Sequence, residues 1–480
     1  MNQNKEPRHS RRKDRDPRPW EKVQIAVFAL ALTGMTVLGL LLPLRPTESE
    51  SEKRKLAEFP DFSWEALVSG DYFDGISKWY ADTFPLRDMW VEANGRWEDA
   101  YGLPQDEDMN IHGDVQQGDE IPDVPDAPTL PPLPTQSTTQ TTTTTTGSTA
   151  TETTQTDTTQ NTTTTTRPTT PPTAQIGGEN VISQSFDAVL QVGDAAFEYY
   201  NFKQAVADRY AAMLNHTAKK LQGKANVYTI VVPNSMGVML PDDLRGKVNS
   251  SDQGKAMRYI FSKTDESVFD VPIYDTLMAH RDEYLYFRTD HHWTQRSAYY
   301  AYATLMQVKG KMPASLDDYP QKKFDNFLGT FYSATKQSPA LGNNPDCVEA
   351  WLPRSTNDLT ITGYDGKKFK WNVVYDVSNR SASRKYSCFI GGDYPFTEIK
   401  NPTKNDGSAC VVIKESYGNA FVPFLVDEYE HVYVVDYRYY KPKLDEFMKN
   451  YAVQDIIFVN NISATRSSTL VGYLEKFVGK

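Results

Sequence analysis

Short apolar runs alternate with amphipathic segments through residues 176–480, and this alternation restricts the fold more than any other feature. Four runs rich in Val and Ile predict strands, namely residues 226–233, 409–414, 431–436 and 455–460. Four segments show helical spacing, namely residues 202–221, 253–261, 294–306 (with Thr294 as a possible N-cap) and 419–429. Continuous apolar strands separated by helices predict an α/β domain of three layers, built on a parallel sheet. Because such sheets carry their sites at the carboxyl ends of strands, the residues after 409–414 become the first candidates.

A threonine-rich tract separates this body from the N-terminal part of the chain. Residues 136–173 hold 23 threonines in 38 positions, and a proline-rich, acidic stretch precedes them. Neither segment can bury enough apolar surface to offset the entropy of ordering, so residues 106–175 are predicted to be disordered. Composition leaves open whether the tract is O-glycosylated or spans a cell wall.

Residues 45–105 form an aromatic-rich arm before the tract. Their spacing predicts two short amphipathic helices, at residues 63–82 and 86–100, interrupted at Phe84-Pro85. A segment of this length seldom makes a core of its own. We therefore expect the arm to pack on the 176–480 body.

Residues 23–42 are apolar apart from one amide and two threonines, and about 20 residues suffice to cross the hydrocarbon layer. Residues 1–22 carry eight basic and four acidic side chains, which favours a cytoplasmic location for this tail. No small-residue cleavage site follows, so residues 23–44 are predicted to be an uncleaved signal anchor rather than a cleaved signal peptide. We expect a single-pass protein of the cell membrane with its C-terminal domain outside the cell.

The charge and the cysteines exclude further classes. The net charge of −11, less +4 for residues 1–22, leaves −15 on the remainder, which argues against nucleic acid as a partner. Cys347, Cys388 and Cys410 are far apart and lack metal-ligand spacing. Buried free thiols are expected, with one disulfide as the alternative, and no motif calls for a cofactor.

Ser416 follows the apolar run 409–414 directly, in the order strand, sharp turn, helix. The N–H groups that open a helix favour developing negative charge, as an oxyanion hole requires. A serine that only caps the helix is the alternative.

Asp290, His291 and His292 lie together just before a predicted helix, in a chain with only seven histidines. A serine hydroxyl needs an adjacent base, and Asp-x-His supplies an imidazole together with a carboxylate that fixes its tautomer. We assign His292 as the base and Asp290 as its partner. A metal site made by these three residues and a structural helix cap at Thr294 remain alternatives.

These motifs together resemble the DHHW family, which is related to the SGNH hydrolase-like domains of alginate O-acetyltransferases. The resemblance covers nearly all the predicted extracellular chain and includes residues 84–88, 288–294, 327–330, 391–393, 415–421 and 435–440. In those relatives the dyad is Asp-x-His, which maps onto Asp290 and His292. The dyad precedes the serine here, so the resemblance implies an SGNH hydrolase-like fold with permuted motif order.

Two positions depart from the family pattern: Glu415 stands where Asp is usual, and Asp393 where Asn is frequent. An ionised Asp393 cannot donate a hydrogen bond to an oxyanion. Tyr417, Asn419 and Arg438 are therefore the candidates for supporting the oxyanion or the substrate. Packing, helix capping and a surface ion pair are their respective alternatives.

The expected chemistry is acyl transfer through Ser416. The resemblance implies O-acetylation of a cell-surface polysaccharide, with the acetyl group exported by a multi-pass membrane acyltransferase. A carbohydrate esterase with the same triad is one alternative. A non-catalytic scaffold or binding protein that retains the fold is another.

Overall fold

The computed structural model describes residues 109–125 and 186–480 throughout, and residues 23–24, 26–30, 33–34, 45–49, 54–64, 67, 71–86 and 89 of the preceding part. It divides into two compact units, one of Met1–Ser49 with Arg54–Ala93 and one of Glu50–Lys53 with Asn94–Lys480. No helix among the described residues is long and apolar enough to cross a bilayer. Most of the predicted span, the tract 136–173 and most of residues 86–100 lie outside the described residues, so those predictions stay untested. The prediction of disorder for residues 106–175 is wrong at residues 109–125, because Asn110–Gly113 form a strand and the Asp119 N–H donates to the Phe202 carbonyl.

Among the described residues of the smaller unit, a hairpin and the helix α3 have defined bounds. Strand β1 (Glu48–Ser49) pairs antiparallel with β2 (Arg54–Lys55), and helix α3 spans Asp71–Asp82. The Ala57 N–H donates to Asp82 Oδ2 at 2.8 Å, and the Arg45 guanidinium lies 3.9 Å from the centroid of the Trp79 ring. With its bounds at Asp71 and Asp82, helix α3 corresponds to the second half of the helix predicted at residues 63–82.

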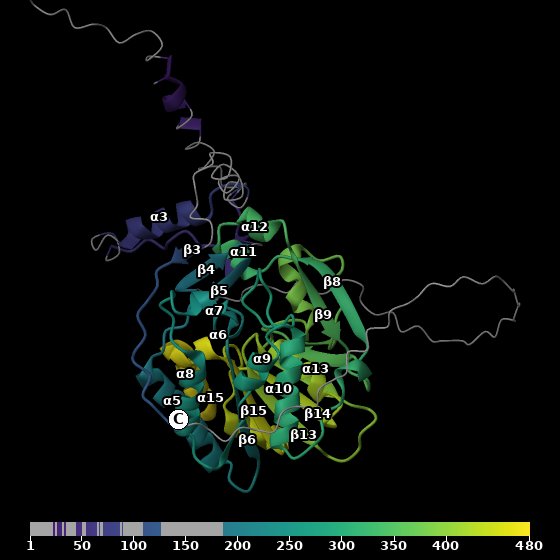
Figure 1. Ribbon diagram of the computed structural model, residues 1–480. Helices are drawn as coiled ribbons and strands as arrows, with labels where there is room; N and C mark the ends of the chain where they lie inside the picture. The colour runs from purple at the N-terminus through teal and green to yellow at the C-terminus, as the bar shows by residue number, and fades with distance from the viewer. Residues whose placement is uncertain are drawn as a thin grey trace, which may run out of the picture. The chain divides into compact units, whose positions relative to one another are not determined.

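An eight-stranded sheet organises the larger unit (Figure 1). Its order is β11 (Lys368–Asn372), β10 (Asp358–Thr362), β12 (Phe396–Lys400), β14 (His431–Asp436), β13 (Ala409–Lys414), β15 (Asp455–Asn461), β6 (Asn226–Val232) and β7 (Val268–Asp270). The five strands from β14 to β7 are parallel, which confirms the four predicted strands and their shared direction.

The prediction of a wholly parallel sheet is wrong at one edge. Strands β10, β11 and β12 run antiparallel to their neighbours, so the sheet is mixed. These strands escape sequence reasoning because they are only partly buried: β11 reads KFKWN and keeps Lys368 and Lys370 in solvent. Partly solvated edge strands lack the continuous apolar run that marks the central strands.

Helices cover both faces of the central strands, since every residue of β13 and β15 is buried. Helix α5 (Gln204–Lys220) packs against α8 (Gln253–Ser262) and α15 (Ser468–Val478), while α10 (Gln295–Val308) packs against α13 (Gly418–Leu425). Figure 1 shows the central strands between these two groups of helices. All four predicted helices are present, although the one expected at residues 419–429 ends at Leu425.

The other elements surround this core. The described helices that remain are α6 (Ser235–Val238), α7 (Asp242–Arg245), α9 (Tyr274–Ala279), α11 (Thr330–Ala334), α12 (Pro339–Gly342) and α14 (Leu444–Asn450), with 3-10 turns η2 (Leu316–Asp318), η3 (Ala382–Cys388) and η4 (Ile462–Arg466). A three-stranded antiparallel sheet joins β3 (Asn110–Gly113), β4 (Ala188–Val192) and β5 (Ala195–Glu198). A separate hairpin joins β8 (Gln321–Phe327) to β9 (Asp346–Trp351).

The structure tests two further predictions, the state of the cysteines and the N-cap of α10. All three cysteines are free; Cys388 and Cys410 are buried and Cys347 is half-buried. Thr294 does occupy the N-cap position of α10, but its side chain caps nothing. Its Oγ1 donates to the Tyr284 carbonyl at 2.7 Å.

Candidate active site

The loop that carries the two histidines is a tight, hairpin-like turn ahead of α10. Tyr286 and Trp293 form an isolated antiparallel bridge across it, and the Thr294 N–H donates to the Leu285 carbonyl at 2.9 Å. Asp346 at the start of β9 holds the loop from outside: its Oδ2 accepts the Thr289 N–H and hydroxyl, each at 2.7 Å. The loop is thus fixed by backbone pairing and by one buried carboxylate.

Asp290 is fully buried and uses both carboxylate oxygens. Its Oδ1 lies 2.5 Å from Nδ1 of His292 and accepts the His292 N–H at 3.1 Å. Its Oδ2 accepts the N–H of Thr330 at 2.8 Å and the Thr330 hydroxyl at 3.1 Å. A carboxylate so placed keeps the proton of a neutral imidazole on Nδ1 and leaves Nε2 as the acceptor.

Ser416 meets that acceptor, although 124 residues separate the two positions in the chain. Its Oγ lies 2.8 Å from His292 Nε2. Ser416 follows the carboxyl end of β13, and the helix α13 begins two residues later. The side chain makes no cap to α13, so the alternative of a simple N-cap serine finds no support. Ser416, His292 and Asp290 therefore form a continuous hydrogen-bonded chain.

Three aromatic side chains fix the His292 ring and the turn that carries Ser416. Tyr386 of η3 stacks on the His292 ring, with centroids 3.8 Å apart and an interplanar angle of 14°. Its hydroxyl donates to the Ser416 carbonyl at 3.1 Å. The fully buried Tyr417 donates its hydroxyl to the His291 carbonyl, and Trp293 Nε1 donates to the Tyr417 carbonyl at 2.9 Å. These contacts join the histidine loop to the serine turn.

The three candidates for oxyanion or substrate support all have partners within the protein. The Tyr417 N–H donates to Glu415 Oε2 at 3.2 Å, and Asn419 Nδ2 donates to Asp393 Oδ1 at 2.9 Å. The Arg438 side chain is only 7% exposed and pairs with Asp436 and Asp393, so the alternative of a surface ion pair is wrong for it. Their roles toward a substrate stay predictions.

Asp393 is held as an anion by two cations. Lys414 Nζ lies 3.0 Å from its Oδ1, and Arg438 lies 2.8 Å from its Oδ2. Burial alone would raise the pKa of Asp393, but the Lys414 and Arg438 charges outweigh burial and hold that pKa well below its usual range. The structure thus supports the view that Asp393 cannot donate to an oxyanion.

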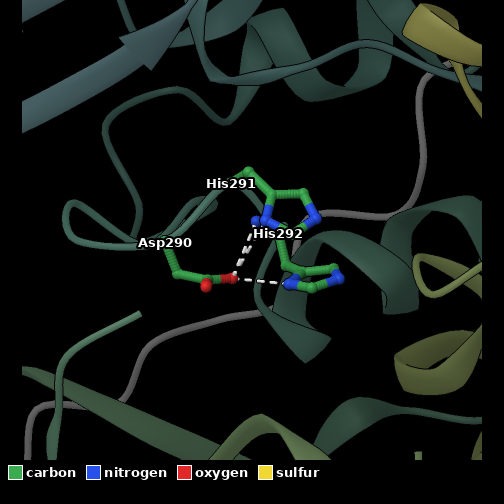
Figure 2. A group of neighbouring side chains, drawn as sticks. All are labelled: Asp290, His291 and His292. Carbon is green, nitrogen blue, oxygen red and sulfur yellow. Dashed lines mark hydrogen bonds and ion pairs between the residues drawn. The ribbon is translucent and has the colours of Figure 1, made fainter. Parts of the chain in front are cut away.

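A metal ion could in principle use Asp290, His291 and His292, whose ligand atoms lie within 4.8 Å of one another. Figure 2 shows a carboxylate oxygen of Asp290 facing both rings. The 2.5 Å separation of Asp290 Oδ1 and His292 Nδ1 is a hydrogen-bond distance, whereas two ligands of one tetrahedral zinc lie about 3.3 Å apart. His291 Nδ1 is also bound to the Thr330 hydroxyl at 2.6 Å. The geometry favours a hydrogen-bonded triad over metal ligation.

Sequence reasoning missed four residues of this site. Thr330 and Gly329 lie in the recognised segment 327–330 but carried no assigned role, and nothing in the sequence singled out Asp346 or Tyr386. Their contacts to Asp290, Thr289 and His292 come from the start of α11, from β9 and from η3, whose positions depend on tertiary packing.

Comparison with known proteins adds the family. The family described as DHHW protein matches residues 52–435, which is most of the chain. The chain belongs to the DHHW family. This result confirms the resemblance drawn from the motifs. No protein with a curated functional description matches the chain.

Two solved structures share the fold of this DHHW protein. A DHHW family protein from Eubacterium siraeum DSM 15702 is 28% identical with a TM-score of 0.54, and the match covers 60% of this chain and 94% of that one. PatB1 of Bacillus cereus, in a structure with a sulfonyl adduct, is 17% identical with a TM-score of 0.51, and the match covers 60% of this chain and 97% of that one. The second likeness concerns the fold alone.

Proposed function

We propose that this DHHW protein is a serine O-acyltransferase that carries an acetyl group on Ser416. The observation on which the proposal depends is the chain from Ser416 Oγ through His292 to Asp290, with separations of 2.8 and 2.5 Å. A serine hydroxyl becomes nucleophilic when an adjacent base takes its proton, and this chain places a base within reach.

The proposed reaction has two matching halves. Ser416 Oγ attacks the acetyl carbonyl of the donor while His292 Nε2 takes the hydroxyl proton, and Asp290 stabilises the imidazolium. The leaving group departs with that proton, which leaves acetyl-Ser416. In the second half, His292 deprotonates a hydroxyl of the acceptor, which attacks the acetyl carbonyl and regenerates the Ser416 hydroxyl.

The N–H of Ser416 is the proposed oxyanion donor. Among the described residues it has no hydrogen-bond acceptor, whereas the N–H of Tyr417 already donates to Glu415. A free donor beside the nucleophile can stabilise the developing charge of the tetrahedral intermediate.

Transfer is favoured over hydrolysis by the burial of the site. Ser416 has 7% and His292 5% of its surface exposed, and a site with little access to water protects an acyl intermediate. The polysaccharide acceptor and the multi-pass membrane acyltransferase as donor are implied by the family resemblance, and the extracellular location is implied by the apolar segment 23–42. They are part of the proposal.

The test uses the full chain in mild detergent with a chromogenic acetyl ester. We expect turnover that Ser416→Ala and His292→Ala abolish, and that Asp290→Asn lowers by about 10³ to 10⁴, since the amide favours the wrong tautomer. The matched control is His431→Ala, a half-buried histidine at the start of β14 that faces Tyr433. Its turnover should equal that of the wild type.

Added polysaccharide separates the remaining possibilities. Acetyl groups recovered on the polysaccharide would support the transferase, and release of acetate alone would support the esterase. If the wild type shows no turnover, and the Ser416, His292 and Asp290 variants behave in the same way, a non-catalytic scaffold is favoured instead.

A further inference from the structure

Glu415 lies against the nucleophile and is used by no step described above. Its Oε2 is 3.3 Å from Ser416 Oγ and 3.2 Å from the Tyr417 nitrogen. Its Oε1 accepts the N–H of Asn461 at 2.8 Å, and only 4% of the residue is exposed. Both carboxyl oxygens are therefore fixed by backbone donors, one at the N-cap of α13 and one at the end of β15.

Whether the contact between Glu415 Oε2 and Ser416 Oγ is a hydrogen bond depends on which of the neighbouring groups carry protons. The oxygen lies between His292 Nε2 and Glu415 Oε2, at 2.8 and 3.3 Å, but the serine supplies a single proton. Because Asp290 keeps the imidazole proton on Nδ1, Nε2 accepts the serine proton. The contact to Glu415 is then a hydrogen bond only if the carboxyl group is protonated and donates to Oγ.

An ionised Glu415 has the opposite effect. A carboxylate accepts only, so it competes with His292 for the serine proton and places negative charge beside the developing oxyanion. We propose that Glu415 is a positioning residue: its protonated form directs the Ser416 hydroxyl to His292, and its ionised form withdraws the hydroxyl from His292. The inference rests on the proposed function for its role in turnover, but the geometry itself concerns Ser416 alone.

Burial shifts Glu415 toward its protonated form, and this effect outweighs the Arg438 charge and the backbone N–H groups of Asn461 and Tyr417, which favour the carboxylate. Burial raises the pKa of Glu415, and the opposing charge of Arg438 is shared with Asp436 and Asp393. Burial also raises the pKa of Glu198, and Glu198 and Glu415 disfavour each other's ionisation. The titratable groups that face Glu415 are Tyr210 of α5, Glu198 of β5, His292 of the histidine loop, Tyr386 of η3, Tyr417 next in the chain, and Tyr437 and Arg438 after β14.

The test is the pH dependence of Ser416 reactivity in the full chain, measured as the rate of inactivation by phenylmethylsulfonyl fluoride and as acetyl-ester turnover. The wild type should lose reactivity at acid pH, since a protonated base cannot take the serine proton. It should also lose reactivity at alkaline pH, by about tenfold per pH unit above the pKa of Glu415, since the active form is the protonated one.

Glu415→Gln should remove the alkaline fall, because an amide does not ionise. The maximal rate of this variant is expected below that of the wild type, since the amide cannot accept hydrogen bonds from the N–H groups of both Tyr417 and Asn461. The comparison therefore uses the shape of the pH–rate profile and not the maximal rate. Circular dichroism melting confirms that the variant is folded. The wild-type alkaline limb is a second measurement that needs no variant.

The outcomes separate the inference from the proposed function. Labelling of Ser416 with an alkaline limb that Glu415→Gln removes supports the inference, even without acetyl turnover. Turnover with identical profiles in wild type and Glu415→Gln, or a wild type that stays active at alkaline pH, overturns the inference and leaves the proposed function intact. Failure of the sulfonyl fluoride to react with Ser416 at any pH overturns both.

Discussion

At the scale of single residues, the site depends on how closely the chain approaches Asp290. Gly329 lies directly against this carboxylate: a Cβ added at Gly329 would lie 2.1 Å from Asp290 Oδ2. The next residue, Thr330, supplies the N–H and hydroxyl that bind the same oxygen. A glycine here lets the turn after β8 approach the carboxylate closely enough to orient it.

Gly329→Ala should therefore displace Asp290 or the Thr330 turn. We expect a loss of about 1–3 kcal/mol in the free energy of unfolding, typical of overpacking, together with a fall in ester turnover as the orientation of His292 relaxes. Urea denaturation and turnover are the measurements.

The matched control for this prediction is Gly246→Ala. An added Cβ at Gly246 meets nothing within 4 Å, and the backbone there has φ of −79°. Its stability and turnover should stay near those of the wild type. If Gly329→Ala behaves like this control, the close approach to Asp290 does not constrain the site.

At the scale of elements, β13 ends in a buried lysine next to the nucleophile turn. Lys414 Nζ lies 3.0 Å from Asp393 Oδ1 and 2.9 Å from Asp436 Oδ2 of the neighbouring strand β14. The lysine is fully buried, so bulk water does not reach its ammonium group. Arg438 completes the group by pairing with both carboxylates. The network ties β13, β14 and the 391–393 turn together beneath Ser416.

Lys414→Met should be strongly destabilising, by about 3–5 kcal/mol, because it leaves buried carboxylates undercompensated. The folded-state pKa of Asp393 is depressed, so its stabilising contribution is present above the pKa of an unfolded Asp and is lost as pH falls through the folded value. The difference between wild type and Lys414→Met should therefore narrow toward acid pH. Urea unfolding across a pH series measures it.

Lys368→Met is the control at this scale. Lys368 on β11 is exposed and paired with Glu398 at 2.6 Å, so its loss should cost about 0–1 kcal/mol. Equal costs for the two lysines would show that the buried network contributes no more than a surface pair.

At the scale of the whole molecule, the segment that holds the threonine tract joins two paired strands. Strand β3 pairs with β4, and the Asp114 N–H donates to the Asp187 carbonyl, so the chain leaves and re-enters one small sheet. Residues 126–185, which lie outside the described residues, connect the two sides. The tract is predicted from its composition to add nothing to the core.

Deletion of residues 136–173 tests that prediction. It shortens the 60-residue connection by 38 residues and leaves 22, which can reach about 70 Å when extended. Unfolding should cost about 1 kcal/mol more, since closing a shorter loop loses less entropy, and turnover of a soluble ester should not change. A lower melting temperature or a loss of turnover would show that the tract does contribute to the fold or to the site.

The sequence by itself determined the central strands, most of the helices around them, and the three residues of the hydrogen-bonded chain from Ser416 through His292 to Asp290. These features are local: a continuous apolar run marks a strand buried on both faces, and the motifs around Asp290, His292 and Ser416 are contiguous in the chain. These three residues could be singled out because the proposed acyl transfer needs those side-chain types.

Only the tertiary structure decided the remainder. The antiparallel edge of β10, β11 and β12 depends on which half-exposed strands find partners, and single-chain periodicity does not encode that pairing. The contacts of Gly329 and Tyr386 with the triad, and the place of Glu415 beside Ser416 Oγ, join segments distant in sequence or depend on side-chain direction. Such contacts are set by packing of the whole domain, because no local pattern specifies the distance between two atoms brought together from different elements.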